Sequence, residues 1–244
     1  MAQQTGWKNE RTALQRNLQC YEDQLTKLQN GQKSYPSDLL ALRDYIQESL
    51  AKKYGKTVQV SILADLINIT EGKWANVIEG YLRRQKFYLL TEPQHYREAV
   101  GLLKQYTREN KCYHYRIVNT HSLLSEQMDV KKNSLAMVIS TQHSAARKYV
   151  DFLLARVERV EDISTVNGRR TAVTVDGMLY QGFTTARMNA DDWKMHYIGE
   201  DSIPQQIEAV KRLIHNEQIQ ISRLSGLIEP LQAWVGEKTL SDEF

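Results

Sequence analysis

The residues that could do chemistry are scattered along this chain. The two cysteines, Cys20 and Cys112, do not form a Cys-x-x-Cys pair, and no His-Glu-x-x-His segment is present. A zinc site therefore has no sequence support. Cys112 lies near His114, but a thiol nucleophile needs a base held within hydrogen-bond reach, which closeness in sequence does not provide. We predict structural or surface roles for all six histidines, which are His95, His114, His121, His143, His196 and His215.

Phosphate-binding loops are also missing. A P-loop needs Gly-x-x-x-x-Gly-Lys-Ser/Thr, so that backbone amides can cradle the phosphates. The segments 31–34 (Gly-Gln-Lys-Ser) and 72–74 (Gly-Lys-Trp) lack the upstream glycine, and no Gly-x-Gly-x-x-Gly occurs. We therefore expect no cofactor and no enzymatic activity from this chain itself.

Carboxylates leave one catalytic alternative open. A metal-dependent nuclease would need clustered carboxylates around the metal ion. Asp65, Glu79, Asp176 and Asp191 are available, although their spacing matches no known pattern. A small nuclease-type α/β domain on a coiled-coil tether is thus a second hypothesis, and a coiled-coil adaptor that binds another protein is a third.

Basic residues form three short clusters at predicted turns or helix ends, where long cationic side chains can reach outward. The net charge of +3 and the pI near 8.7 are only mildly basic and do not identify a nucleic-acid binder. Contact with double-stranded DNA through such clusters would be independent of sequence and sensitive to salt. The predicted DNA contacts are Arg83, Arg84 and Lys86, then Lys131 and Lys132, then Arg169 and Arg170.

The elements that would position these residues begin and end with apolar stripes at heptad spacing. Steps of three and four residues keep one seam facing a partner helix, as in a coiled coil. Two such stripes around a globular middle predict one antiparallel coiled coil with a domain at its tip. The first seam contains Trp7, Leu14, Leu18, Tyr21, Leu25 and Leu28, and the second contains Ile207, Val210, Ile214, Ile221, Leu224, Ile228, Leu231 and Val235, with the polar Glu217 inside it.

The middle of the chain alternates between strand and helix patterns, which favours an α+β or α/β fold. We predict helices at 37–54, 74–82, 95–108 and 143–154, and strands at 87–90, 113–118, 134–140, 170–175 and 178–180. Asp176-Gly177 predicts a type I′ hairpin turn, and residues 184–198 are expected to be irregular. The expected domains are an arm at 1–33, a middle domain at 34–203 with halves at 36–120 and 130–203, and an arm with tail at 204–244.

Composition places the chain among ordinary water-soluble proteins, with 25% charged and 41% hydrophobic residues. No apolar run approaches the roughly 18–20 residues that a membrane span requires. The first residues carry no secretory signal. With two cysteines in different segments, a disulfide is not expected, so the cytoplasm is the expected location, without any membrane partner.

Specific segments resemble the hinge of SMC-type (structural maintenance of chromosomes) proteins. Residues 63–69 and 74–82 look like the hinge pattern L-x-D-L-I-x-V … A-I-E-x-x-L, and residues 170–180 look like its later V-T-x-D-G hairpin. Within the family, the run to Trp193, Ile198-Gly199 and the exit helix is most similar to the MukB/MksB/JetC branch, which includes condensin-like and Wadjet anti-plasmid subunits. Where the family has a Gly-rich dimer contact, residues 181–187 contain the single glycine Gly182.

The resemblance implies a homodimerisation module without catalytic function, associated with the nucleoid. The ATPase heads of such proteins lie outside this chain, and the other subunits of the complex would bind through regions outside it. Exposed strand edges invite pairing with a partner strand. We therefore expect the segment 180–187 of one chain to meet the segment 113–118 of another. The predicted contact residues are Tyr113, Tyr115, Ile117, Tyr180, Gly182, Phe183, Thr184 and Thr185.

Overall fold

The computed structural model describes the backbone of residues 2–241 and the side chains of residues 5–230. It forms two compact units: the two ends of the chain, up to Ser34 and from Ile203, make the first, and Tyr35–Ser202 makes the second. Among the described helices, none is both long and apolar enough to cross a membrane. Cys20 and Cys112 are both free thiols.

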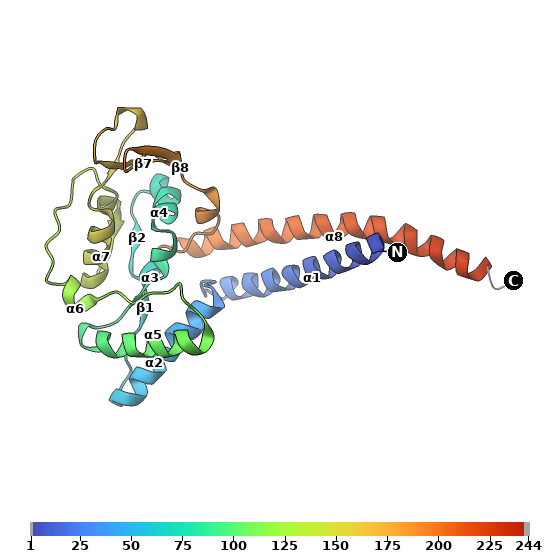
Figure 1. The fold of residues 1–244 in the computed structure, drawn as a ribbon, viewed down its shortest axis with the longest axis horizontal. Helices are drawn as coiled ribbons and strands as arrows, with labels where there is room; N and C mark the ends of the chain where they lie inside the picture. The colour runs from blue at the N-terminus through green and yellow to red at the C-terminus, as the bar shows by residue number, and fades with distance from the viewer. Residues whose placement is uncertain (1, 242–244) are drawn as a thin grey trace. The chain divides into compact units, whose positions relative to one another are not determined.

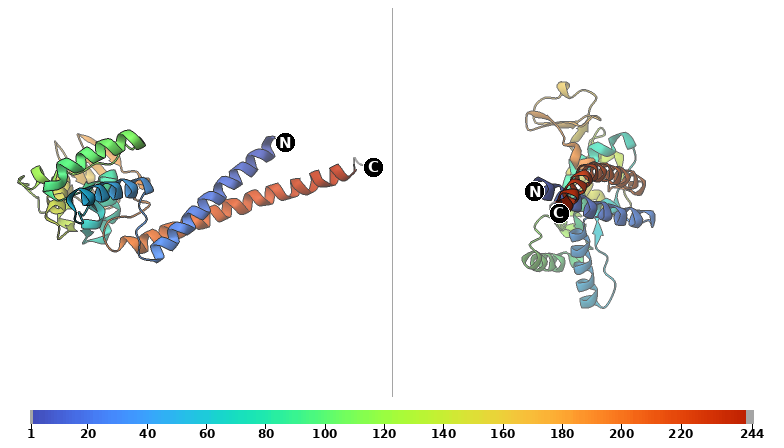
Figure 2. Two further views of the ribbon diagram at one scale, coloured as in Figure 1. Left: turned by 90° about the horizontal axis from the view of Figure 1, so that it is seen from below. Right: turned by 90° about the vertical axis from the view of Figure 1, so that its right-hand side faces the viewer.

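The first unit consists of two long helices, α1 (Ala2–Gln29) and α8 (Ser202–Ser241), which run alongside each other in Figure 1 and Figure 2. Arg11 donates from its guanidinium to Ser225 Oγ over 3.5 Å. The backbone N–H of Ser34, beyond the end of α1, donates to Gln206 Oε1 over 2.9 Å. Since an early part of one helix meets a late part of the other, the two are antiparallel.

Apolar side chains at the heptad positions line this helix pair. Glu217, the polar residue in the second stripe, is half-buried, and its Oε2 atom has no hydrogen-bond partner among the described residues. Leu231 and Val235, which extend the second stripe, lie outside the residues whose side chains are described. Of the remaining seam residues, Leu28, Val210, Leu224 and Ile228 are buried, and Trp7, Leu14, Leu18, Tyr21, Leu25, Ile207, Ile214 and Ile221 are half-buried.

Helices of the second unit form where the sequence places apolar residues at helical spacing. In α2, Leu39, Leu42, Ile46 and Leu50 are buried on one face, and Gly55 ends the helix with a positive φ of 64°. The α-helices are α2 (Ser37–Tyr54), α3 (Leu63–Leu66), α4 (Ala75–Leu82), α5 (Tyr96–Asn110), α6 (Thr120–Leu123) and α7 (Ser144–Leu154). Short 3-10 helices occupy Gly72–Trp74, Arg83–Phe87, Pro93–His95, Leu135–Val138, Ile163–Thr165 and Ala190–Trp193.

Strands in this unit are short and form three small sheets. Two sheets have two antiparallel strands each: β1 (Ser61–Ile62) with β3 (Leu89–Leu90), and β2 (Asn68–Ile69) with β4 (Ile139–Ser140). The third has four strands in the order β5-β6-β7-β8, with β5 parallel to β6 and the other pairs antiparallel. Its strands are β5 (Val157–Arg159), β6 (Thr171–Val173), β7 (Met178–Gln181) and β8 (Thr184–Arg187).

One continuous hydrophobic core holds the second unit together. It extends from Leu39 in α2 to Ile198. It includes Ile78 of α4, Val150 of α7, and Leu135 in the 3-10 helix Leu135–Val138. Both predicted halves, 36–120 and 130–203, contribute to this core, and the pairing of β2 with β4 also joins them. The predicted mixture of α and β structure is confirmed.

Several sequence-based expectations about local structure are wrong. The segment 113–118 is no strand: it makes a single bridge, Ile117 to Leu89. The predicted strand at 134–140 is largely a 3-10 helix: its last two residues form β4, and Ser134 makes an isolated bridge to Glu158. Residues 184–187, expected to be irregular, form β8. Short segments of this kind have too few residues for a clear period, so tertiary pairing decides them.

The turn after β6 also differs from the prediction. Only Gly177 has a positive φ, of 88°, whereas a type I′ turn requires positive φ at both central residues. The N–H of Gly177 donates to Thr174 O, and the N–H of Thr174 donates to Met178 O. The left-handed glycine therefore closes a longer loop in place of a two-residue turn.

Candidate functional site

Strand β8 is the outer strand of the four-stranded sheet, and all four of its residues are exposed. Among the described residues it pairs only with β7, in the register Tyr180 to Thr185 and Gln181 to Thr184. Backbone N–H groups alternate in direction along a strand. Since the N–H of Met188 donates to Gly177 on the β7 side, those of Thr185 and Arg187 face the open edge. This edge can accept a further strand.

The turn between β7 and β8 (Figure 1) holds an exposed aromatic ring in a strained backbone conformation. Gly182 and Phe183 have φ values of 58° and 64°, so the positive-φ pair of a type I′ turn occurs here. Positive φ is unusual for a bulky residue and costs on the order of 1–2 kcal/mol. The Phe183 side chain is 66% exposed. Strained residues cluster at functional sites, which makes Phe183 a candidate contact.

The predicted contact residues differ in their accessibility. Tyr113 is 72% exposed, Ile117 is half-buried, and Gly182, Thr184 and Thr185 are exposed. Two expectations are corrected, since two of the tyrosines are buried and their hydroxyls have partners within the chain. The Tyr115 hydroxyl donates to Asp38 Oδ1 over 2.8 Å, and the Tyr180 hydroxyl donates to Gly168 O over 3.0 Å. These hydrogen bonds offset the cost of burying the two hydroxyls, which allows both rings to pack inward.

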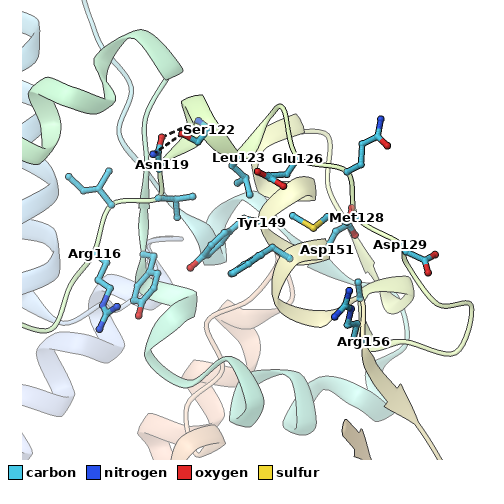
Figure 3. Close-up of a pocket in the computed structure, with 16 residues that line it drawn as sticks. Arg116, Asn119, Ser122, Leu123, Glu126, Met128, Asp129, Tyr149, Asp151 and Arg156 are labelled. Carbon is cyan, nitrogen blue, oxygen red and sulfur yellow. Dashed lines mark hydrogen bonds between the residues drawn. The ribbon is translucent and has the colours of Figure 1, made fainter. Parts of the chain in front are cut away.

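A cavity of about 750 Å³ opens beside the segment 113–118. Figure 3 shows Leu123, Met128 and Tyr149 grouped between Arg116 on one side and Arg156 on the other. The exposed ring of Phe152 stacks on Tyr149 with centroids 6.0 Å apart. The lining thus combines an apolar floor with a rim of mixed charge, to which Glu126, Asp129 and Asp151 also contribute.

Groups around this cavity are fixed by contacts within the chain. The Arg116 guanidinium lies over the Tyr88 ring, 5.9 Å from its centroid. Asp151 accepts from Arg147 Nε over 3.0 Å, so its charge is already paired. Burial raises the pKa of Tyr149 to about 12, and the phenol is therefore neutral near pH 7. A neutral aromatic floor of this kind suits an apolar side chain.

Of the first predicted basic cluster, Arg83 and Arg84 are exposed, and Arg83 Nε lies 3.0 Å from Asp192 Oδ2. The expectation that Lys86 reaches outward is wrong, since this residue is only 3% exposed. Its Nζ atom lies 2.6 Å from Glu79 Oε2 and also donates to the carbonyl oxygens of Glu79 and Asp192. A buried ammonium group requires such a set of acceptors.

The second carboxylate oxygen of Glu79 binds a segment that is distant in the sequence. Glu79 Oε1 accepts from the backbone N–H groups of Tyr197 and Ile198, over 2.6 and 2.8 Å. The pair therefore joins α4 to the segment 192–198. Sequence reasoning missed it, because Glu79 and Lys86 stand seven positions apart with a helix end between them, and each looks like a solvated surface residue.

The remaining two basic clusters converge on one carboxylate. Glu158 in β5 is 5% exposed and accepts from Lys131 Nζ over 2.8 Å and from Arg170 Nε over 3.2 Å. The bond from Arg170 outweighs desolvation and, with Lys131 and Asn133, lowers the pKa of Glu158 to about 2. Lys132 and Arg169 are exposed beside these pairs. The two clusters lie far apart in the sequence, so the sequence alone does not predict that they form one basic surface.

The four carboxylates considered for a nuclease are each engaged elsewhere. Asp65 accepts from the Tyr35 hydroxyl, Asp176 from the Thr174 hydroxyl, and Asp191 pairs with Lys194, while Glu79 binds Lys86. Within the described residues they form no metal-ligand group. The nuclease hypothesis therefore lacks the convergence it needs.

Comparison with known proteins gives structural similarities only. No protein-family model matches the chain, and no curated protein matches it. The solved structures include the Pyrococcus furiosus Smc hinge domain with an extended coiled coil, at 18% identity over 99% of this chain and 88% of that one, with a TM-score of 0.45. An asymmetric dimer of the Geobacillus stearothermophilus SMC hinge domain is 14% identical over 96% of this chain and 94% of that one, with a TM-score of 0.46. The S. pombe Smc5/6 hinge domain is 15% identical over 94% of this chain and 93% of that one, with a TM-score of 0.47.

Proposed function

We propose that this chain is the hinge of an SMC-type subunit, and that it joins two subunits by homodimerisation. The observation that carries the proposal is the exposed edge of β8, which begins directly after the strained, exposed Phe183. Two antiparallel helices at the chain ends and the hinge-like sequence segments at 63–82 and 170–180 support the same reading.

The dimer is two-fold symmetric, so that each chain contributes both halves of the contact. The outer edge of β8 from one chain approaches the segment 113–118 of the other. That segment binds Leu89 through only two of its backbone groups, Arg116 O and Val118 N. Main-chain hydrogen bonds of this kind supply affinity, and side-chain pockets supply specificity.

Phe183 of one chain fills the cavity next to the other chain's segment 113–118. Its ring meets Tyr149 and Phe152, which already stack on each other. Aromatic pairs contribute about 0.5–1.5 kcal/mol beyond the area they bury. Arg116 and Arg156 on the rim then face the polar side chains that flank the hairpin tip.

A proline at position 185 tests the pairing of edges. The Thr185 N–H faces outward, so Thr185→Pro leaves the β7 ladder intact but removes a donor from the interface. We expect the variant to fold and to sediment as a monomer at concentrations where the wild type is dimeric. Thr185→Ala, which keeps the donor, is the matched control and should remain dimeric. A dimeric Thr185→Pro protein would refute the proposed contact.

The basic surface around Glu158 contacts double-stranded DNA without reading its sequence. Lys132 and Arg169 are exposed and carry charge that Glu158 does not neutralise, and Arg83 and Arg84 add a second group. We expect Lys132→Glu with Arg169→Glu to lower DNA affinity and to reduce the slope of log K against log salt by about 1–2. Lys104→Glu, an exposed charge on α5, is the control. Unchanged binding in the double variant would remove DNA from the proposal.

The wider setting is a complex of the MukB/MksB/JetC branch, either a condensin-like loop extruder or an anti-plasmid system, in the cytoplasm near the nucleoid. The resemblance of the segment up to Trp193 and Ile198-Gly199 supports this branch. Sequencing the gene beyond both ends tests it. Long heptad segments on each side with a P-loop upstream are the expected result, and their absence would contradict the proposal.

A further inference from the structure

Three potential metal ligands meet where α2 begins and where the chain leaves α5. Asp38 lies in the first turn of α2, and Cys112 and His114 follow the end of α5. Asp38 Oδ2 is 3.4 Å from His114 Nε2 and 3.9 Å from Cys112 Sγ, and all three ligand atoms lie within 4.8 Å of one another. The sequence gives no zinc motif, because 74 residues separate Asp38 from Cys112.

These distances suit a tetrahedral ion. Zinc binds oxygen and nitrogen at about 2.0–2.2 Å and sulfur at about 2.3 Å, which places neighbouring ligand atoms about 3.3–3.8 Å apart. The separations between Asp38 and its two neighbours lie within a few tenths of an ångström of that range. A carboxylate, a thiolate and an imidazole are also the ligand types that zinc takes in proteins.

Neighbouring groups hold the three side chains in this arrangement. Asp38 Oδ1 accepts from the Tyr115 hydroxyl over 2.8 Å and from the Leu39 N–H over 3.0 Å, which leaves Oδ2 turned toward Cys112 and His114. The His114 ring packs edge-on against the Tyr115 ring, with centroids 5.2 Å apart. Outer partners that orient the ligands in this way are typical of metal sites.

The arrangement of the three side chains favours metal binding over thiol chemistry. Asp38 contacts both other residues directly, whereas in a catalytic triad the histidine lies between the acid and the nucleophile. A divalent cation would displace the thiol proton.

We propose that Asp38, Cys112 and His114 form a binding site for a zinc-type divalent ion, with the fourth position open to water. The site joins the start of α2 to the segment that follows α5. All three ligands come from one chain, so the site does not require a dimer, although His114 lies within the segment 113–118 that the proposed dimer contact uses.

Anaerobic titration of the full chain with Co²⁺, a spectroscopic substitute for Zn²⁺, tests the site. We expect one ion per chain, with a thiolate-to-cobalt charge-transfer band and the visible bands of a tetrahedral ion, and loss of both when Zn²⁺ is added. Cys112→Ser and His114→Ala should abolish the charge-transfer band and the tetrahedral spectrum respectively. Cys20→Ser and His121→Ala, which change an exposed cysteine and an exposed histidine, should leave the spectrum unchanged.

Tyr115→Phe tests the outer partner, and we expect it to weaken the affinity about 10- to 100-fold. The imidazole of His114 is 43% exposed, so His114→Ala is expected to fold. It therefore tests the site even when Cys112→Ser, which changes a buried residue, does not fold. Zn²⁺ should also raise the melting temperature of the wild type but not that of His114→Ala. A wild-type spectrum without the thiolate band, or a band that survives in Cys112→Ser, would overturn the proposal.

Discussion

Replacing Phe183 with asparagine should separate the stability of a single chain from the strength of the dimer. Phe183 has a φ of 64° and is 66% exposed, so within one chain its ring is strained and little of it is buried. Asparagine adopts positive φ more readily than a bulky residue does. Phe183→Asn should therefore stabilise the isolated chain and weaken dimerisation.

The expected size of each effect follows from the structure. Relief of part of the backbone strain should contribute about 0.5–1 kcal/mol to the stability of the single chain. Fully burying a phenylalanine is worth about 1.5–3 kcal/mol. Two thirds of that amount remains for the dimer, or about 1–2 kcal/mol at each of two symmetric sites. At 1.4 kcal/mol per factor of ten, the dimer dissociation constant should rise about 30- to 700-fold.

Two assays read these effects separately. Sedimentation equilibrium gives the dimer dissociation constant, and thermal unfolding at a concentration well below that constant gives the stability of the single chain. An increase of about 1–4 °C in the melting temperature is expected for a chain of this size. Val175→Asn serves as a control, since Val175 is a 47%-exposed apolar residue in the turn between β6 and β7 and should leave the dissociation constant unchanged.

A dissociation constant for Phe183→Asn equal to that of the wild type would refute the role given to Phe183. A melting temperature that falls in the isolated variant would show that the ring stabilises its own chain, and the inference from backbone strain would then be wrong.

Three further predictions concern buried or paired carboxylates. Lys86→Met leaves the Glu79 carboxylate buried without its cation and should lower the free energy of unfolding in urea by about 3–5 kcal/mol. Glu79→Gln in the same chain should restore part of this loss. A loss below about 1 kcal/mol would contradict the buried pair. Because the folded-state pKa of Glu158, about 2, lies below its ordinary value of 4.5, its contribution to stability is present above pH 4.5 and is lost as the pH falls toward 2. The stability difference between the wild type and Glu158→Gln should therefore shrink over that range, and a difference independent of pH would disprove the assignment. Glu217→Leu removes from the seam a buried carboxylate oxygen that has no partner among the described residues, and it should raise the melting temperature of the helix pair α1 and α8, measured by far-ultraviolet circular dichroism. A lower melting temperature would show that Glu217 has a stabilising partner.

Elements with a long, regular apolar period could be predicted from the sequence. The helices α2, α4, α5 and α7 lie within a few residues of their expected ranges, because in each of them an apolar face repeats over at least 8 residues. The pairing of β6 with β7 was also predicted, since a glycine-containing turn separates two apolar runs.

What the sequence could not reveal depends on contacts between distant residues. Lys86 is buried because Glu79 and the carbonyl of Asp192 surround it, and nothing in its neighbouring sequence indicates this. Tyr115 can pack inward because Asp38, far away in the chain, accepts a hydrogen bond from its hydroxyl. The same folding event brings Asp38 to Cys112 and His114. Pairwise contacts of this range leave no periodic signal in one sequence.

The most direct test of the proposed hinge function is the oligomeric state of the wild-type chain. Sedimentation velocity across a concentration series, with Thr185→Pro run alongside, measures it without assumptions about DNA or partner subunits. We predict a concentration-dependent shift from monomer to dimer that Thr185→Pro abolishes. A wild-type chain that remains monomeric throughout the series would contradict the account.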